Sequence, residues 1–232
     1  MNYCYIKGLR IFSFATRDQL IEFVDKEKKS LIAVNAEKIL HATEETKSLI
    51  NQNIGYADGI GAVKALRKKG FKEAVKIPGC ELWIDIVRYF YKYKTFYLVG
   101  AKQEVIQKTV EKLRQEFTGI NIIGYRNGYI NSFLEQEELV QEIREKKPDI
   151  VFVAMGSPKQ ESLMQKMQTY HPAIYQGLGG SFDVYVGNVL RAPEWWVRND
   201  LEWAYRLIKQ PSRIKRQIHL IRFLGYIIFN RI

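Results

Sequence analysis

Five short apolar runs alternate with longer stretches of helical period, and this alternation constrains the fold of the chain more than any other feature. Interpreted as strands, the runs cover residues 31–35, 96–100, 120–124, 150–156 and 173–180. Two of the intervening stretches, 101–117 and 136–147, repeat apolar residues at spacings of four, which is typical of amphipathic helices. The alternation predicts an α/β fold, Rossmann-like, with a mostly parallel sheet covered by helices.

Loops that follow the expected strands are the first place to look for a site. In parallel α/β sheets, ligands bind outside the carboxyl ends of the strands. In this chain those ends are Asn35, Gly100 and the segments 156–158 and 177–180.

The segment 177–183, Gly-Leu-Gly-Gly-Ser-Phe-Asp, is a glycine-rich turn after the last expected strand. Because Gly179 and Gly180 have no side chains, backbone N–H groups there can approach an anionic ligand such as a diphosphate. A purely structural turn explains the same pattern. The segment is not the dinucleotide fingerprint, because Phe182 stands where the third glycine is required, so a nicotinamide enzyme is disfavoured.

The segment 154–161 leaves a strand and enters a helix near Pro158. We expect Ser157 as the N-cap of this helix and Gln160 in its first turn. An amide there can donate to and accept from sugar hydroxyls, whereas Glu161 only complements the helix dipole. Capping explains every residue of the segment except Gln160.

Asn35 stands at a strand-to-helix junction, and Asp58 precedes a glycine pair, Gly59 and Gly61. Asp-Gly is also a common turn, so a structural role for Asp58 stays open. Facing the crevice, Asp58 would take a proton from an attacking hydroxyl, which contributes roughly 10²–10⁴ in rate. The chain has no Asp-x-Asp pair to hold a divalent metal on a nucleotide diphosphate. Charge on such a leaving group must then be met by other groups.

The positive charge of the chain is concentrated near its end. From Trp203 to Ile232 there are seven Lys or Arg and no Asp or Glu, so the formal charge of +11 falls to +4 without this segment. Cations interleaved with apolar residues favour an anionic membrane surface, where each cation contributes roughly 1 kcal/mol. An alternative is a helix packed on the protein with solvated cations. Nucleic acid is disfavoured, because no zinc-finger, RNP or basic-zipper pattern is present.

A helix over this tail has two apolar faces at about 100° per residue. One face holds Ile214, Ile218 and Ile221, and the other holds Leu220, Phe223, Leu224 and Ile227. One face is available for protein and one for lipid.

Three arginines of the tail are candidate diphosphate ligands: Arg206, Arg213 and Arg216. A guanidinium binds phosphate oxygens bidentately and stays protonated, so these residues can replace a metal ion at a departing diphosphate.

The length of 232 residues is ample for one large core. We expect a core domain over residues 1–195 and a basic, amphipathic appendage over 196–232. The longest apolar stretch of the tail, 224–229, is far shorter than the ~20 residues that span a bilayer, and the start does not resemble a signal peptide, so we expect a cytoplasmic location. The cysteines, Cys4 and Cys80, and the three histidines are scattered, which indicates neither a disulfide framework nor a metal site.

Seven motifs run in order over most of the chain: Asn35-Ala-Glu-Lys, Ala57-Asp-Gly, Gly156-Ser-Pro-Lys-Gln-Glu, Gly179-Gly-Ser-Phe-Asp, Arg191-Ala-Pro, Glu202-Trp-Ala-Tyr-Arg and Gln210-Pro-Ser-Arg-Ile-Lys-Arg. Together they resemble the WecG/TagA/CpsF family of bacterial glycosyltransferases. The versions found here are closest to the branch that acts in enterobacterial common antigen synthesis.

The resemblance implies an inverting transfer of N-acetyl-D-mannosaminuronate from UDP to lipid-linked GlcNAc on undecaprenyl diphosphate. It implies a peripheral enzyme at the cytoplasmic face of the inner membrane that needs no metal or other cofactor. By the same resemblance, Asp58 is the catalytic base, Asn35 and Gln160 lie near the amino sugar, and Arg206, Arg213 and Arg216 lie at the diphosphate.

One position departs from part of the family. Some members that use unoxidised N-acetylmannosamine carry Thr where this chain has Ala33, which fits a different donor. The carboxylate of a uronate requires a cationic partner, for which Lys159 and Lys38 are candidates. Two alternatives stay open: a UDP-N-acetylmannosamine transferase of the teichoic-acid or capsule type, and a non-catalytic module that binds anionic ligands.

Overall fold

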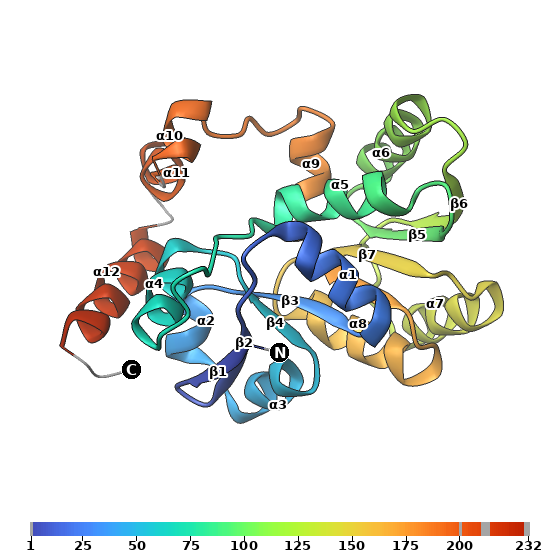
Figure 1. The fold of residues 1–232 in the computed structure, drawn as a ribbon. Helices are drawn as coiled ribbons and strands as arrows, with labels where there is room; N and C mark the ends of the chain where they lie inside the picture. Colours follow the sequence, from blue (N-terminus) through green and yellow to red (C-terminus); the bar gives the residue numbers. More distant parts are fainter. Residues whose placement is uncertain (1, 200, 210–213, 230–232) are drawn as a thin grey trace. The chain divides into compact units, whose positions relative to one another are not determined.

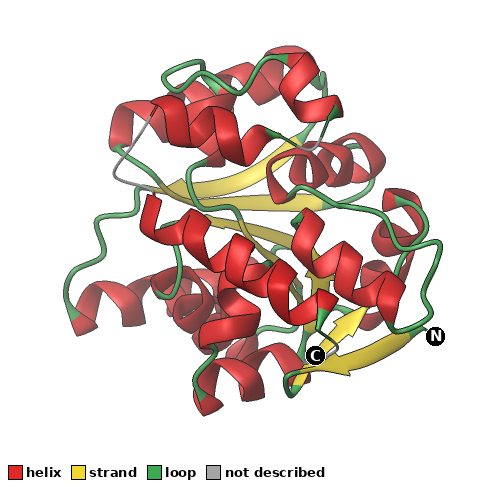
Figure 2. Cartoon of the chain, turned by 90° about the vertical axis from the view of Figure 1, so that its left-hand side faces the viewer, coloured by secondary structure: helices red, strands yellow, loops and turns green. Residues whose placement is uncertain are grey.

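The computed structural model of the protein describes residues 2–199, 201–209 and 214–229. The α/β fold class expected from the sequence is confirmed. In the described residues, eight strands form a mostly parallel sheet flanked by helices (Figures 1 and 2). The strand order is β1-β2-β4-β3-β8-β7-β5-β6. The strands are β1 (Tyr3–Ile6), β2 (Leu9–Phe12), β3 (Ser30–Val34), β4 (Ile54–Ala57), β5 (Thr95–Gly100), β6 (Asn121–Arg126), β7 (Ile150–Ala154) and β8 (Ile174–Gly177).

Strands β1 and β2 form an antiparallel hairpin, whereas β2 with β4, β3 with β8, β7 with β8, and β5 with both β7 and β6 pair in parallel. Strands β1, β2 and β4 lie outside the five strands expected from the sequence. Each has only four residues, and β4 includes a glycine. At Gly55, a Cβ atom would lie 2.7 Å from the Arg10 carbonyl oxygen, so close strand approach requires glycine here.

By its internal contacts the chain divides into two units, and each is described by itself. The first unit contains residues 1–15, 33–78 and 190–232, and the second contains residues 16–32 and 79–189. The division into a core of 1–195 and an appendage of 196–232 stays a prediction.

Six described helices belong to the first unit: α2 (Ala36–His41), α3 (Glu44–Gln52), α4 (Ile60–Lys68), α10 (Glu194–Arg198), α11 (Glu202–Lys209) and α12 (Ile214–Ile228). Helix α3 packs on β2 and β4, and the side chain of Asn51 fixes the hairpin by accepting from the Arg10 amide and donating to the Gly8 carbonyl, at 2.7 and 2.9 Å. Helix α12 lies against α2 and α4 (Figure 1).

The second unit has its own core and six described helices: α1 (Arg17–Glu27), α5 (Gly79–Phe90), α6 (Gln103–Glu116), α7 (Phe133–Lys146), α8 (Lys159–Tyr170) and α9 (Ser181–Tyr185). On one side of the strands, Tyr97 and Val153 pack in a cluster with residues of α7 and α8. On the other side, Trp83 of α5 makes an edge contact with Phe152, with ring centroids 5.6 Å apart. Because strand side chains alternate in direction, β7 serves both layers.

Some helices and strands start or end at other residues than expected from the sequence. The strand expected to reach residue 156 ends at Ala154, and the one expected to reach 180 ends at Gly177. The helix expected from 136 begins at Phe133, because Ser132 and Glu135 form a reciprocal capping box that starts it earlier. In the described parts of the chain, no helix has the length and hydropathy needed to cross a membrane.

Candidate functional site

Asn35 and Asp58 lie side by side in the first unit, at the carboxyl ends of β3 and β4. The Asp58 amide donates to the Val34 carbonyl at 3.1 Å, so the residues that end the two strands are joined directly. A Cβ atom added at Gly59 would lie 3.6 Å from the Asn35 Cβ. Both Asn35 and Asp58 are partly exposed. The amide and the carboxylate therefore share one edge of the sheet.

The backbone around Asp58 is held from two sides. While the Asp58 amide bonds to Val34, the Ala57 carbonyl accepts from the Ile77 amide at 2.9 Å. The loop that carries the carboxylate is therefore fixed between β3 and the segment that precedes residue 78. Such a fixed position suits a group that must hold a reacting hydroxyl.

Asn35 also has a local role as the N-cap of α2. Its Oδ1 atom accepts from the Lys38 amide at 2.9 Å. The predicted strand-to-helix junction is confirmed. A ligand contact of this side chain can use Nδ2 as a donor or the second lone pair of Oδ1 as an acceptor.

Gln160 joins two loops of the second unit. Its Oε1 atom accepts from the Gly156 amide after β7 at 3.2 Å and from the Gly179 amide after β8 at 2.9 Å. The side chain is only 6% exposed. At Gly177, a Cβ atom would lie 2.4 Å from Gln160 Nε2, so glycine there makes room for the amide. Sequence reasoning placed Gln160 correctly in the first turn of a helix but missed this link between loops.

The glycine-rich turn has two kinds of glycine. Gly179 has a φ of +58°, which disfavours other residues, whereas Gly180 has an ordinary φ of −95°. A Cβ atom at either position would meet no protein atom of the described structure within 4 Å. The turn therefore leaves open space above its backbone, as a diphosphate-binding loop requires.

The predicted N-cap of α8 is wrong. Pro158 rather than Ser157 occupies the N-cap position, and no side chain caps it. The Ser157 hydroxyl instead donates to Glu161 Oε1 at 2.6 Å. Glu161 is buried and serves this local bond, which the helix-dipole interpretation did not include.

Short helix α9 follows the glycine-rich turn and is held by aromatic contacts that no sequence motif indicated. The Trp83 ring meets Phe182 and Tyr185 of α9, with centroids 5.5 and 5.0 Å apart. Lys112 of α6 donates to the Tyr185 carbonyl at 2.7 Å. These contacts fix the far end of the turn.

Two of the motifs found in the sequence meet within the first unit. Arg191 of Arg-Ala-Pro pairs with Glu202 of Glu-Trp-Ala-Tyr-Arg, with Nε and Oε1 3.8 Å apart. Helices α10 and α11 are further joined by Trp196 and Tyr205, whose ring centroids lie 5.8 Å apart. The Arg-Ala-Pro motif and the Glu-Trp-Ala-Tyr-Arg motif are therefore in contact in the folded chain.

The three predicted arginines are placed only in part. Arg206 belongs to α11 and Arg216 to α12, but their side chains are not described, and Arg213 lies outside the described residues. Their predicted contact with a diphosphate stays a prediction.

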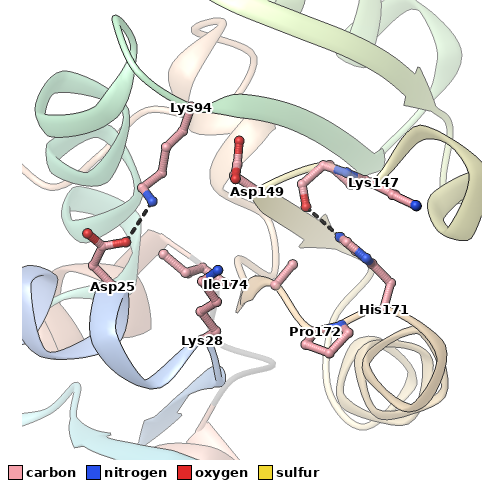
Figure 3. A pocket seen from close by; sticks show the side chains of 10 residues that line it. Asp25, Lys28, Lys94, Lys147, Asp149, His171, Pro172 and Ile174 are labelled. Atoms are coloured by element: carbon pink, nitrogen blue, oxygen red, sulfur yellow. Dashed lines mark hydrogen bonds and ion pairs between the residues drawn. The ribbon is translucent and has the colours of Figure 1, made fainter.

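A small cavity of about 100 Å³ lies at the other edge of the second unit, where β8 starts (Figure 3). Its lining includes Lys94, which pairs with Asp25 at 2.6 Å, and His171, which bonds to the Pro148 carbonyl at 2.8 Å. Because this lining lies at the amino ends of β5, β7 and β8, the cavity is at the opposite end of these strands from the loops at Gly156 and Gly179.

The predicted site residues thus form two groups. Asn35 and Asp58 come together in the first unit, and Gln160, Gly179 and Gly180 come together in the second. Within its own unit, each group lies at the carboxyl ends of parallel strands, where α/β proteins commonly bind their ligands.

The sequence also matches a known protein family over nearly its whole length. The sequence profile described as "Glycosyl transferase WecG/TagA/CpsF family" matches residues 5–232. The chain belongs to the WecG/TagA/CpsF family of glycosyltransferases. The protein is therefore a glycosyltransferase, and its family uses, in general terms, a nucleotide-sugar donor and a lipid-linked acceptor.

Proposed function

We propose that this protein transfers N-acetyl-D-mannosaminuronate from UDP to the GlcNAc of a lipid-linked acceptor on undecaprenyl diphosphate, as in enterobacterial common antigen synthesis. The observation that carries the proposal is the side-by-side position of Asn35 and Asp58 at the ends of β3 and β4. Family membership supports the reaction class.

The proposed reaction is a single displacement with inversion. Asp58 takes the proton of the acceptor 4-hydroxyl as its oxygen attacks the anomeric carbon of the donor sugar. The bond from that carbon to the diphosphate oxygen breaks, and UDP leaves with the electron pair. A general base in this position contributes roughly 10²–10⁴ in rate.

The remaining roles follow from the same proposal. Asn35 and Gln160 hold the donor sugar, Asn35 through Nδ2 and Gln160 at the loop junction that it forms. The open backbone at Gly179 and Gly180 receives the diphosphate, and Arg206, Arg213 and Arg216 balance its charge in place of a metal ion.

Replacing the proposed base tests the mechanism. Asp58→Asn keeps the size of the side chain and removes its basicity, so kcat should fall by roughly 10²–10⁴ with little change in donor binding. Asp183→Asn, in the glycine-rich motif, is the matched carboxylate control, and a smaller loss is expected. Wild-type turnover by Asp58→Asn at saturating substrates removes Asp58 from the role.

The donor is decided by a panel of UDP-sugars with a synthetic lipid-diphosphate acceptor. The proposal expects the uronate to give the highest kcat/KM. Preference for UDP-N-acetylmannosamine, the alternative for a teichoic-acid or capsule enzyme, would replace the donor and leave the reaction class unchanged. Binding of UDP-sugars without any turnover would favour a non-catalytic module.

Peripheral membrane association is the second part of the proposal. At the end of α12, Ile228 and Phe229 are 71% and 74% exposed, and Arg222 on the same helix is exposed as well. Apolar and cationic groups together favour an anionic lipid surface. The full-length protein should co-sediment with vesicles that contain phosphatidylglycerol, and the double variant Ile228→Ser/Phe229→Ser should bind them more weakly. Equal binding by wild type and variant, or equal binding to neutral vesicles, contradicts the proposal.

A further inference from the structure

The C-terminal helix α12 packs on the first unit through one of its two apolar faces. Phe223 is fully buried and Ile227 is 8% exposed, whereas Ile228 and Phe229 next to them are mostly exposed. The partners of the buried face are α2 and α4, which lie beside α12 in Figure 1. Phe223 and Ile227 belong to the second of the two faces expected from the sequence, and this face contacts protein.

The centre of this contact is a seam between the first turns of α2 and α4, formed by Ala36 and Gly61. A Cβ atom added at Gly61 would lie 3.1 Å from Leu220 Cδ1, 3.2 Å from Ala36 Cβ and 3.3 Å from Phe223 Cδ1. Close packing of all three helices depends on the missing side chain of Gly61. Phe223 therefore sits at the point where the two helix starts approach each other.

A residue of the proposed site lies directly before or at the start of each of these two helices. Ala36 directly follows Asn35, the N-cap of α2, and Gly61 is the second residue of α4, three residues after Asp58. Since the Asp58 amide bonds to the Val34 carbonyl, the two helix starts and the two site residues form one connected group. A shift of α2 against α4 would change the spacing of Asn35 and Asp58.

Three further contacts hold α12 along its length. His219 and His41, at the end of α2, form a hydrogen bond with ring nitrogens 2.9 Å apart. Lys68, the last residue of α4, donates from Nζ to the Ile227 carbonyl. Lys7 lies over the Tyr226 ring, 4.6 Å from its centroid. The helix thus spans α2 and α4 with contacts near the starts and the ends of both.

We propose that Phe223 is a positioning residue: docked in the Ala36–Gly61 seam, it fixes α2 against α4 and so sets the geometry of Asn35 and Asp58. This inference rests on the roles given to Asn35 and Asp58 under the proposed function. It is separate from the tail arginines, because it acts through apolar packing in the part of the helix that contacts α2 and α4. The basic tail then affects turnover through its buried face as well as through its charge.

The first test measures kcat of four single variants with a short-chain, water-soluble lipid-diphosphate acceptor. Phe223→Ala empties the seam, and Gly61→Val overfills it. Each should lower kcat by up to about 10²-fold, the loss typical of a misplacement near 1 Å. Phe223→Leu refills most of the space and should recover most of the turnover. Gly225→Val is the matched control, because a Cβ atom at Gly225 on α12 would meet no described atom within 4 Å.

A double-mutant cycle separates positioning from a general loss of folded enzyme. If Phe223 acts through Asp58, Phe223→Ala should cost little more in the Asp58→Asn background, because the group that it positions is already lost. Effects of the two changes that multiply would overturn the inference. Where Phe223→Ala does not fold, Phe223→Val takes its place in the cycle with a smaller expected loss.

Hydrogen exchange gives a readout besides activity. In Phe223→Ala, amides of the first turns of α2 and α4 should exchange faster, while those of the second unit at α7 should not change. Unchanged exchange at α2 and α4 together with wild-type turnover contradicts the positioning role. Failure of the base proposal looks different, since Asp58→Asn alone would then keep wild-type turnover.

Discussion

Gln160 Oε1 accepts a hydrogen bond from the Gly179 amide, 19 residues along the chain, at 2.9 Å. The same atom accepts from the Gly156 amide at 3.2 Å. One buried carbonyl oxygen thus ties the loop after β7 to the glycine-rich turn after β8. The shape of the proposed diphosphate loop depends on a side chain from another segment.

Removing this link should cost stability. Gln160→Ala leaves two backbone N–H groups without their acceptor, at about 1–3 kcal/mol for each that stays buried. Urea unfolding should therefore show a clear drop in the free energy of unfolding, together with a raised KM for the UDP-sugar. Gln165→Ala, an exposed glutamine on the same helix, is the control and should change little. An unchanged stability of Gln160→Ala would mean that water replaces the link at no cost.

Two adjacent glycines of the turn should respond differently to alanine. Gly179 has a φ of +58°, so Gly179→Ala forces a left-handed conformation at roughly 1–2 kcal/mol and lowers the melting temperature. Gly180 has a negative φ and open space, so Gly180→Ala should fold normally. If the diphosphate contacts the backbone there, the added methyl of Gly180→Ala should still raise the KM for the UDP-sugar. Normal KM values for both variants would place the diphosphate elsewhere.

A uronate donor needs a cation, and the two candidates can be separated by charge removal. Lys159 is exposed in the first turn of α8, and Lys38 is partly buried in the first turn of α2. Loss of a charge-assisted hydrogen bond should raise the KM for UDP-N-acetylmannosaminuronate by about 10- to 100-fold in Lys159→Met or Lys38→Met. UDP-N-acetylmannosamine, which lacks the carboxylate, is the control substrate and should be unaffected. Equal losses on both substrates would indicate a structural role.

The capping box at the start of α7 predicts how the stability of the fold changes with pH. Backbone N–H bonds from Ser132 and Asn131 hold the pKa of Glu135 below its ordinary value near 4.5. Since the folded pKa is the lower one, this carboxylate stabilises the fold at pH values above 4.5, and the contribution is lost as pH falls through the folded pKa. The stability difference between wild type and Glu135→Gln should therefore shrink as the solution is acidified from about pH 6 to about pH 3. Parallel stability curves for the two proteins would contradict this.

Much of the fold could be predicted from local patterns. The runs at 96–100 and 150–156 became β5 and β7, because continuous apolar stretches can be buried on both faces of a parallel sheet. Strands of four residues, such as β4, carry too few residues for a pattern to stand out. Ser157 was expected as the N-cap of α8, but its hydroxyl bonds to Glu161, four residues on, and not to a backbone amide of the helix.

The sequence by itself determined the α/β class, the family, and the loops on which the candidate residues stand. These follow from local periodicity and from short motifs, which do not depend on distant parts of the chain. Only the tertiary structure decided that Asn35 lies beside Asp58, that Gln160 supports the glycine-rich turn, and that the Phe223 face of α12 packs on α2 and α4. The physical reason is that these contacts join segments far apart along the chain. Which buried face or polar group finds which partner is settled by packing and hydrogen-bond geometry, and local sequence does not encode it.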